Sequence, residues 1–285
     1  MSSATRNDKL DRAGLGQYWS RLSERHLAAG DADLGAIIYA GMPAWFNKLV
    51  DVFQHKALDR LLEGTDVSNK RVLDVGTGIG RWARWYSRYA GNQVVGVDAE
   101  PNRLASALSA DRRITYLQMP VDNLAFPDET FDIVHCVAVL QHVHDEVKQR
   151  AIAEFCRVLK PGGSMILCEL TDMGDDAAHT FPWPSRKWSS EFAKHGLAAR
   201  RTIGVDYLPL LRLLKAVFKA LQRDRAAQGI AEMKSESRPG LSGMIMGPLR
   251  IATYLSYPIE EVVRFLPPQY ARMTCYLFER PSASG

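Results

Sequence analysis

The sequence Val72-Leu-Asp-Val-Gly-Thr-Gly-Ile-Gly80 places three glycines directly after a short apolar run, and the helix-like run Arg81-Trp-Ala-Arg-Trp-Tyr-Ser-Arg-Tyr89 follows it. Glycine tolerates a positive φ and lets another molecule approach bare backbone, while a helix N-terminus offers unpaired N–H donors. The pattern therefore predicts a strand, a ligand-binding turn and a helix.

A second apolar run, Gln93-Val-Val-Gly-Val-Asp98, predicts a buried strand that ends in a carboxylate. At this spacing from the glycines, an acid can accept hydrogen bonds from the diol of a ribose. The dinucleotide-binding fingerprint would need its third glycine at position 81, where the chain has Arg81. A nicotinamide-dependent dehydrogenase is therefore disfavoured.

The spacing Asp74-x-Gly-x-Gly-x-Gly80 resembles motif I of the class I S-adenosylmethionine-dependent methyltransferases, and Asp98 resembles the acid that binds the cofactor ribose in that family. Two later sequences extend the resemblance: Pro127-Asp-Glu-Thr-Phe-Asp132 precedes the fourth strand of the family, and Arg157-Val-Leu-Lys-Pro-Gly-Gly163 leads into its fifth. Together these motifs cover roughly residues 67 to 170.

Strands and helices alternate from residue 71 to 170, which predicts a parallel sheet covered by helices on both faces. The resemblance implies a doubly wound, mostly parallel seven-stranded sheet, and Lys160-Pro-Gly-Gly163 predicts a sharp turn. The expected divisions are an N-terminal helical extension (1–66), the methyltransferase core (67–206), a helical cap inserted before the last strand (207–266), and the last core strand with a tail (267–285).

The resemblance also implies S-adenosylmethionine as the cofactor. The three glycines would lie against its methionine part, Asp74 would organise the loop and its amide donors, and Asp98 would hold the ribose. Many relatives place an acid for the adenine amino group where this chain has Pro120, so that contact is expected from Asp122, from backbone near Val121, or not at all. The expected cofactor-binding residues are Asp74, Gly76, Thr77, Gly78, Gly80, Asp98, Ala99, Val121, Asp122 and Val137.

Two residues are candidate general bases for a hydroxyl acceptor, His142 at the end of the fourth strand and Glu169. Histidine as a residue type titrates near neutral pH and serves as a base with little tuning. Relatives often carry histidine at this position whatever their acceptor, so a structural role in capping the loop is an equal alternative. His144 and Asp145 are further candidates, whereas His135 inside the strand is expected to be a core or supporting residue.

Two aromatic pairs precede the first strand, Tyr18 with Trp19 and Trp45 with Phe46, each in an expected helix. Helix packing is the expected role of all four side chains. The alternative is that Tyr18 or Trp19 folds over the cofactor as part of a lid.

Residues 207 to 265 form a long insertion with nine basic and five acidic residues, a difference that equals the net charge of +4 of the whole chain. Basic residues recur at helical intervals from Arg212 to Arg223 among leucines. Such a helix usually presents a solvated basic face. The alternatives are contact of 207–225 with an anionic membrane surface, or binding of a phosphorylated substrate.

The 285-residue chain has the composition of a globular protein, and its charge is too small to indicate nucleic-acid binding. The polar start and the lack of a long apolar run predict a cytoplasmic protein, with peripheral contact at the inner face of the membrane as an option. No metal-binding cluster is evident. The four cysteines are widely spaced and are expected to be buried reduced thiols: Cys136, Cys156, Cys168 and Cys275.

These features favour a methyltransferase that acts on a small molecule or on a glycan- or lipid-linked intermediate, on oxygen rather than nitrogen or carbon. The prediction of the acceptor class rests on an analogy: the expected cap resembles those of methyltransferases that act in cell-surface glycan and natural-product assembly. The alternatives are a catalytically idle scaffold with the same fold, and an N- or C-methyltransferase of a natural-product pathway.

Overall fold

The computed structural model describes residues 9–28, 34, 38, 44–173, 177–205 and 266–282. The expected cap at 207–266 lies outside the described residues except for its last position. The strands are β1 (Arg71–Val75), β2 (Gln93–Asp98), β3 (Thr115–Gln118), β4 (Phe131–Val137), β5 (Leu159–Leu170), β6 (Ala198–Val205) and β7 (Met273–Glu279). The α-helices are α1 (Arg12–Ala28), α2 (Ala44–Leu61), α3 (Arg81–Tyr86), α4 (Pro101–Ala110), α5 (Asp145–Val158) and α6 (Ser185–Ala193), with short 3₁₀ turns η2 (Leu140–His142) and η3 (Pro268–Tyr270).

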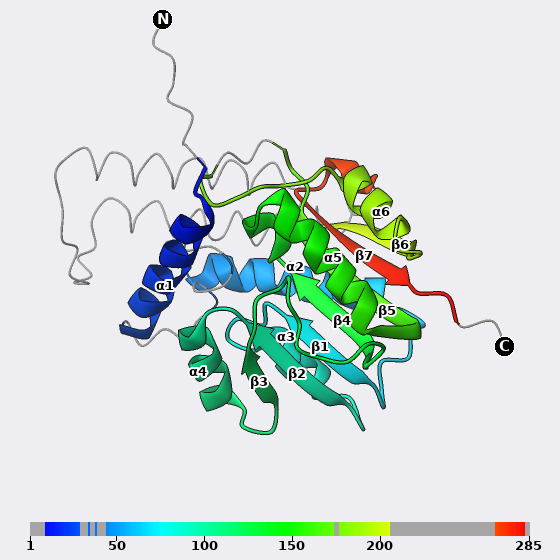
Figure 1. The fold of residues 1–285 in the computed structure, drawn as a ribbon, viewed down its shortest axis with the longest axis horizontal. Helices are drawn as coiled ribbons and strands as arrows, with labels where there is room; N and C mark the ends of the chain where they lie inside the picture. The colour runs from blue at the N-terminus through cyan, green and yellow to red at the C-terminus, as the bar shows by residue number, and fades with distance from the viewer. Residues whose placement is uncertain are drawn as a thin grey trace, which may run out of the picture.

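The seven strands form one sheet in the order β3-β2-β1-β4-β5-β7-β6 (Figure 1). All neighbouring strands pair in parallel except β7, which runs antiparallel to both β5 and β6. This arrangement confirms the predicted doubly wound, mostly parallel seven-stranded sheet with a helical N-terminal extension. The chain order reverses between β1 and β4, so the carboxyl ends of these strands form the crevice in which such sheets bind ligands.

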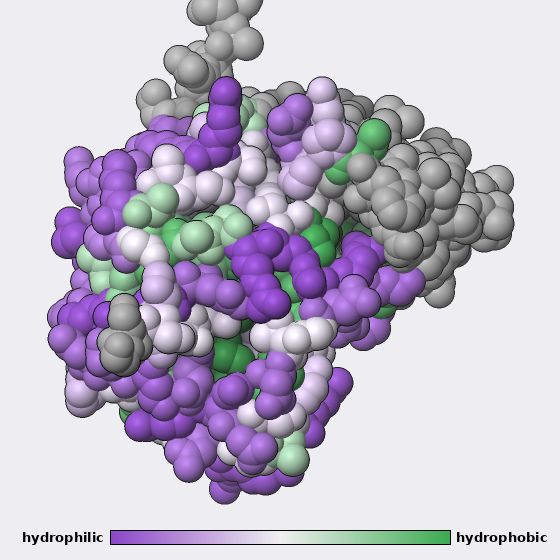
Figure 2. Space-filling model, turned by 90° about the vertical axis from the view of Figure 1, so that its right-hand side faces the viewer, coloured by the Kyte–Doolittle hydropathy of each residue, from purple (hydrophilic) through white to green (hydrophobic). Residues whose placement is uncertain are grey.

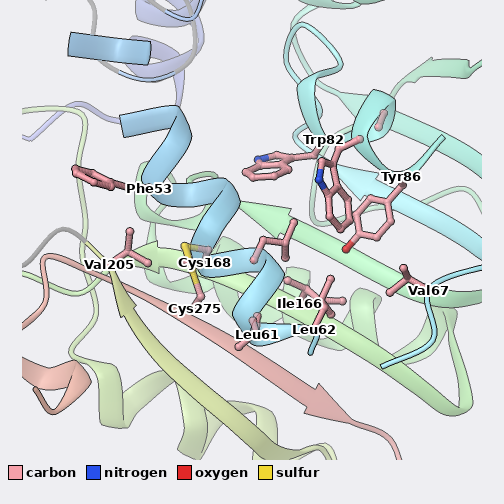
Figure 3. Packing of buried hydrophobic residues seen from close by; sticks show 14 of the residues in the cluster. Phe53, Leu61, Leu62, Val67, Trp82, Tyr86, Ile166, Cys168, Val205 and Cys275 are labelled. Atoms are coloured by element: carbon pink, nitrogen blue, oxygen red, sulfur yellow. A yellow bond between two sulfur atoms is a disulfide. The ribbon is translucent and has the colours of Figure 1, made fainter. Parts of the chain in front are cut away.

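The core is divided by the sheet into two layers. Residues of α2 and α3 pack on one face, and residues of α5 and α6 pack on the other. Successive strand residues alternate between the layers, so that Val72 faces the first and Leu73 the second. Figure 3 shows part of the first layer, where Leu61 of α2 lies near Ile166 and Phe53 of α2 lies near Val205. This burial on both faces fixes the strand ends that carry the site.

Cys168 of β5 and Cys275 of β7 form a disulfide in the layer beneath α2 (Figure 3). The prediction of reduced thiols was wrong for this pair, whereas Cys136 and Cys156 are free and buried. The bonded cysteines are direct partners in the antiparallel ladder but lie 107 residues apart in sequence. Their spacing therefore gave no sign of the pairing.

The predicted sharp turn at 160–163 is instead part of β5. Phe131 pairs with Leu159 and Ile133 pairs with Ser164, so the intervening residues of β5 form a bulge. Gly162 lies in the left-handed region with a φ of 74°. The chain thus passes from α5 directly into an irregular part of β5, with no separate turn between helix and strand.

The surface in Figure 2, which shows the right-hand side of Figure 1, is mainly polar, and hydrophobic residues reach it in small separate groups. Within the described ranges, we find no helix with the length and hydrophobicity needed to span a bilayer.

Candidate active site

The glycine loop after β1 has a backbone that other residues rarely adopt. Gly76, Gly78 and Gly80 have φ values of 68°, 56° and 77°, all in the left-handed region that disfavours side chains. A Cβ atom at Gly76 would collide with Val139, and one at Gly80 with the Tyr116 hydroxyl. The loop therefore packs tightly against its protein neighbours, and a side chain at Gly76 or Gly80 would be both strained and obstructed.

Asp74, at the carboxyl end of β1, connects this loop to α3. Its Oδ2 accepts hydrogen bonds from the Thr77 hydroxyl at 2.6 Å and from the Ala83 backbone N–H at 3.0 Å. The N-cap of α3 is Gly80, which offers no side chain. Asp74 therefore does for α3 what an N-cap side chain does elsewhere, and it satisfies a donor of the first turn.

Asp98, at the carboxyl end of β2, faces the same loop. Its two oxygens accept hydrogen bonds from the backbone N–H groups of Gly78 and Glu100, each at 2.9 Å. Burial raises the pKa of Asp98, and the nearby Arg103 guanidinium opposes that rise. A carboxylate has about four lone-pair positions, so Asp98 retains acceptor capacity for a ligand hydroxyl.

The other expected cofactor residues lie at or just after the carboxyl ends of β2, β3 and β4. The Ala99 carbonyl accepts a hydrogen bond from Gln118 at 3.1 Å, and Val121 and Val137 are half-buried on opposite layers of the core. Asp122 accepts hydrogen bonds from Arg150 at 2.6 and 3.1 Å. Their contacts with adenine remain predictions, and for Asp122 the ion pair would compete with such a contact.

Arg81, which replaces the third glycine of a dinucleotide fingerprint, holds α2 against the start of α3. Its guanidinium donates to Asp51 at 2.8 Å and to Gln54 at 2.6 Å, and it lies 4.2 Å from the centroid of the Trp82 ring. The arginine that stands in place of the fingerprint glycine thus links α3 to α2.

Glu169 is fully buried beside the turn that follows β4. Its carboxylate accepts hydrogen bonds from the backbone N–H groups of Val139, Leu140 and Gln141 at 2.8 to 3.0 Å. Burial raises the pKa of Glu169 to about 7, against the effect of these three donors. The geometry suits an anion that fixes η2, whereas its role as a base stays a prediction.

His142 lies at the end of η2, and both of its ring nitrogens have partners. Nδ1 is 2.9 Å from the His179 carbonyl, which can only accept, so Nδ1 carries the proton. Nε2 is 3.0 Å from Nε2 of Gln141, whose amide orientation is fixed because its Oε1 accepts from the Leu170 N–H. His142 is thus a neutral imidazole with its lone pair occupied by an amide donor.

Tyr18 and Trp19 of α1 contact this histidine region. The Tyr18 ring stacks on His179 with centroids 4.5 Å apart, and the Trp19 ring meets His142 edge-on at 4.7 Å. We call Tyr18, Trp19, His142 and His179 the aromatic cluster. These contacts pack α1 against the core, as the helix-packing interpretation expects, and the lid stays a prediction; Phe46 of the second pair is buried in the core.

Helix α1 is attached to both sides of the crevice. On one side, the Ser20 hydroxyl donates to Glu100 at 2.8 Å, and Arg103 lies over the Trp19 ring at 4.7 Å. On the other, Lys9 at its start donates to the carbonyl of Ala177 at 2.7 Å. The helix therefore crosses the carboxyl edge of the sheet, as its position in Figure 1 shows.

Sequence reasoning missed His179, Arg103 and Glu100 as site residues. Each acts through a partner far away in the chain, and His179 falls in an irregular segment between β5 and α6 that has no periodicity. His144 meets Phe181 in a tilted ring contact at 4.3 Å, and Asp145 pairs with Lys148 and Lys187, so both candidate bases have structural partners and their role as bases stays a prediction.

Comparison with known proteins shows which family the central part of the chain resembles. Residues 73–167 match the methyltransferase domain family. In this region the chain is similar to the class I S-adenosylmethionine-dependent methyltransferases. It is 28% identical over 188 residues to methyltransferase GfsG of Streptomyces halstedii, covering 62% of this chain and 65% of that protein. It is 32% identical over 110 residues to the ubiquinone/menaquinone biosynthesis C-methyltransferase UbiE of Vibrio campbellii, covering 36% of this chain and 42% of that one.

These alignments cover less than two thirds of either relative. The solved structure of the [4+2]-cyclase SpnF has a TM-score of 0.60 at 19% identity, covering 97% of this chain and 98% of that one. That likeness shows a shared fold. Since this neighbour is named a cyclase, the fold alone does not define the reaction.

The family's cofactor is S-adenosylmethionine, and the described residues fit it. The left-handed glycine backbone presents no side chain at the end of β1, and a buried carboxylate with spare acceptor positions faces that backbone from β2. No group of three or more metal-ligating side chains occurs among the residues that the structure describes.

Proposed function

We propose that this protein transfers the methyl group of S-adenosylmethionine to a small-molecule acceptor held on the α1 side of the site. The observation that carries the proposal is the Asp98–Gly78 hydrogen bond, which fixes the ribose-binding acid against the bare glycine loop. When bound, the cofactor supplies an electrophilic methyl on a sulfonium. The chain then has to hold the two reactants in line and exclude water.

The described residues suit these tasks. Asp98 would accept hydrogen bonds from the ribose, and the glycine loop would lie against the methionine part. The aromatic cluster and α1 would shield the crevice from water. A glycan- or lipid-linked acceptor is a narrower proposal, because it depends on the basic residues of 207–225, which lie outside the described residues.

We further propose an oxygen acceptor whose proton passes to Nε2 of His142. Nε2 is the nitrogen that lacks a proton in this tautomer, and the Gln141 amide that occupies it would have to rotate away. General-base assistance of this kind contributes about 10²–10⁴-fold to the rate.

A carbon acceptor is the second candidate. Two observations favour it: one relative is named a C-methyltransferase, and both nitrogens of His142 are satisfied, which suits a histidine that only caps the loop.

The first test is calorimetric titration of ligand-free protein with S-adenosylhomocysteine, with NAD as the control. Micromolar binding of the former alone supports the proposal, and binding of neither would favour an idle scaffold. Turnover is then sought with methyl-¹³C S-adenosylmethionine against hydroxylated small molecules, lipid-linked sugars and quinols. The carbon chemical shift of the product methyl distinguishes a methoxy group from a C-methyl group.

Membrane contact has its own test. Neutralising Arg212, Lys215 and Lys219 together should abolish co-sedimentation with acidic liposomes if 207–225 docks there. Unchanged sedimentation of the triple variant would remove the membrane proposal and leave methyl transfer unaffected.

A further inference from the structure

His135 is a fully buried imidazole in the middle of β4. Its position is a direct neighbour of Asp74 in the parallel β1–β4 ladder, and its Nδ1 lies 3.0 Å from Asp74 Oδ1. A carboxylate oxygen accepts, so Nδ1 carries the proton and donates. This bond occupies the carboxylate oxygen that neither Thr77 nor Ala83 uses.

The other ring nitrogen of His135 has no protein partner among the described residues. The ring lies between two aromatic side chains of α3, with centroid distances of 5.4 Å to Trp82 and 5.3 Å to Tyr86. A buried polar atom without a partner costs free energy, and an apolar side chain would avoid that cost here. The hydrogen bond to Asp74 is therefore what the imidazole adds at this position.

Asp74 needs that bond because its orientation determines the loop. The torsion that rotates a carboxylate is broad when nothing holds it. With Oδ1 held by His135, Oδ2 is directed to the Thr77 hydroxyl and to the first turn of α3. The Thr77 backbone N–H in turn donates to the Val97 carbonyl at 2.9 Å, next to Asp98. Hydrogen bonds thus link β4 through Asp74 and Thr77 to Val97, the residue that precedes Asp98.

We infer that His135 is a positioning residue for the cofactor: through Nδ1 it holds Asp74 in the orientation that fixes the glycine loop. The inference rests on the proposed function, because it assigns the loop to cofactor binding. His135 touches no ligand itself, and its contribution is the geometry of the Asp74 carboxylate.

The substitutions H135N and H135Q both keep a polar amide at position 135 but place its N–H donor at different points. They therefore test whether the position of the donor matters, or only the polarity of the side chain. The side-chain N–H₂ of asparagine overlies Nδ1 of histidine, whereas that of glutamine extends to the position of Nε2. H135N should bind S-adenosylhomocysteine within about twofold of the wild type. H135Q and H135F should bind about tenfold more weakly, the order expected when a buried charged group loses a hydrogen bond. Titration calorimetry measures all three.

Tyr86→Phe is the matched control. Tyr86 contacts the same imidazole, and its buried hydroxyl has no hydrogen-bond partner among the described residues. The substitution removes that hydroxyl and leaves Asp74 untouched, so it should keep the wild-type affinity. Equal affinity of H135F and wild type would overturn the inference, as would equal losses in H135N and H135Q at matched melting temperatures.

Amide hydrogen exchange provides a readout that needs no cofactor. The Ala83 N–H, which donates to Asp74, should exchange faster in H135F and H135Q than in H135N and the wild type. If the wild type bound no S-adenosylhomocysteine, the proposed function would fail, and the exchange pattern would still decide whether His135 positions Asp74. Unchanged Ala83 exchange in H135F would refute the positioning role.

Discussion

The glycine-loop side and the α1 side of the crevice are held together in different ways. On the loop side, Asp74 accepts a hydrogen bond from Thr77, three residues away, and Asp98 accepts one from the Gly78 backbone, twenty residues away. Both hydrogen bonds lie within one βαβ unit. On the α1 side, Ser20 bonds Glu100 eighty residues away and Lys9 bonds the Ala177 carbonyl 168 residues away. The glycine loop is thus held mainly by bonds within one βαβ unit, with His135 of β4 as an addition from outside it. The position of α1 depends on side chains that are distant in sequence.

This difference implies different responses to substitution. Changes on the loop side should act on cofactor affinity and leave acceptor kinetics alone. Changes on the α1 side should alter acceptor kinetics and leave cofactor affinity unchanged.

Gly78→Val should have the largest effect on cofactor binding. Valine at a φ of 56° is strained by about 1–3 kcal/mol, and its side chain would occupy the cofactor surface, so affinity for S-adenosylhomocysteine should fall by about 100-fold or more. Gly196→Val is the control, because Gly196 has a φ of 79° and open space around it. Calorimetry that found both variants equally competent would break the assignment of the loop.

His142→Gln should lower kcat by about 100-fold, with little change in cofactor affinity, if Nε2 is the base. The control is His195→Gln, an exposed histidine beyond α6. A kcat within a few-fold of wild type across the pH range, with a lower melting temperature, would show instead that His142 only caps the loop. Steady-state kinetics with the identified acceptor make the distinction.

Asp98→Ala should weaken binding of S-adenosylhomocysteine by about 1–3 kcal/mol, since it leaves the Gly78 N–H and the ribose without an acceptor. Asp128→Ala, at a side chain that is 73% exposed, should bind normally. An Asp98→Ala titration that overlaid the wild-type curve would place the ribose elsewhere.

Trp19→Ala should have the smallest effect and should appear only in the acceptor KM. Its edge-on contact with His142 is an aromatic pair of the kind worth about 0.5–1.5 kcal/mol, which predicts a rise in KM of about two- to tenfold. Tyr89→Ala, another half-buried aromatic with a ring contact at 4.9 Å, is the control. If cofactor affinity fell with Trp19→Ala instead, the two sides of the crevice would not be separable.

The same contrast explains what the sequence could reveal. The glycine loop, Asp74, Asp98 and the order of strands and helices were predictable, because short-range spacing and buried apolar runs determine them. The bulge in β5 was not, since a Pro-Gly-Gly run fits either a turn or an irregular strand. The contacts of His179 and Arg103 depend on how α1 folds back over the sheet, which no local pattern records.

His135 illustrates a third case. Its place inside an apolar strand indicated a buried residue, and the structure confirms that it is one. Which of its nitrogens has a partner, and that the partner is Asp74, follow only from the register of β1 against β4. Buried polar pairs between neighbouring strands are therefore the part of a site that sequence spacing describes least well.

The disulfide between Cys168 and Cys275 changes the covalent connectivity of the chain. It closes a ring that contains α6, β6 and every residue between β6 and β7. A single peptide-bond cut anywhere inside that ring leaves one covalent molecule until a reductant is added. Proteolysis of the segment that follows β6 would thus nick the oxidised protein without releasing β7, the strand that lies between β5 and β6 in the sheet.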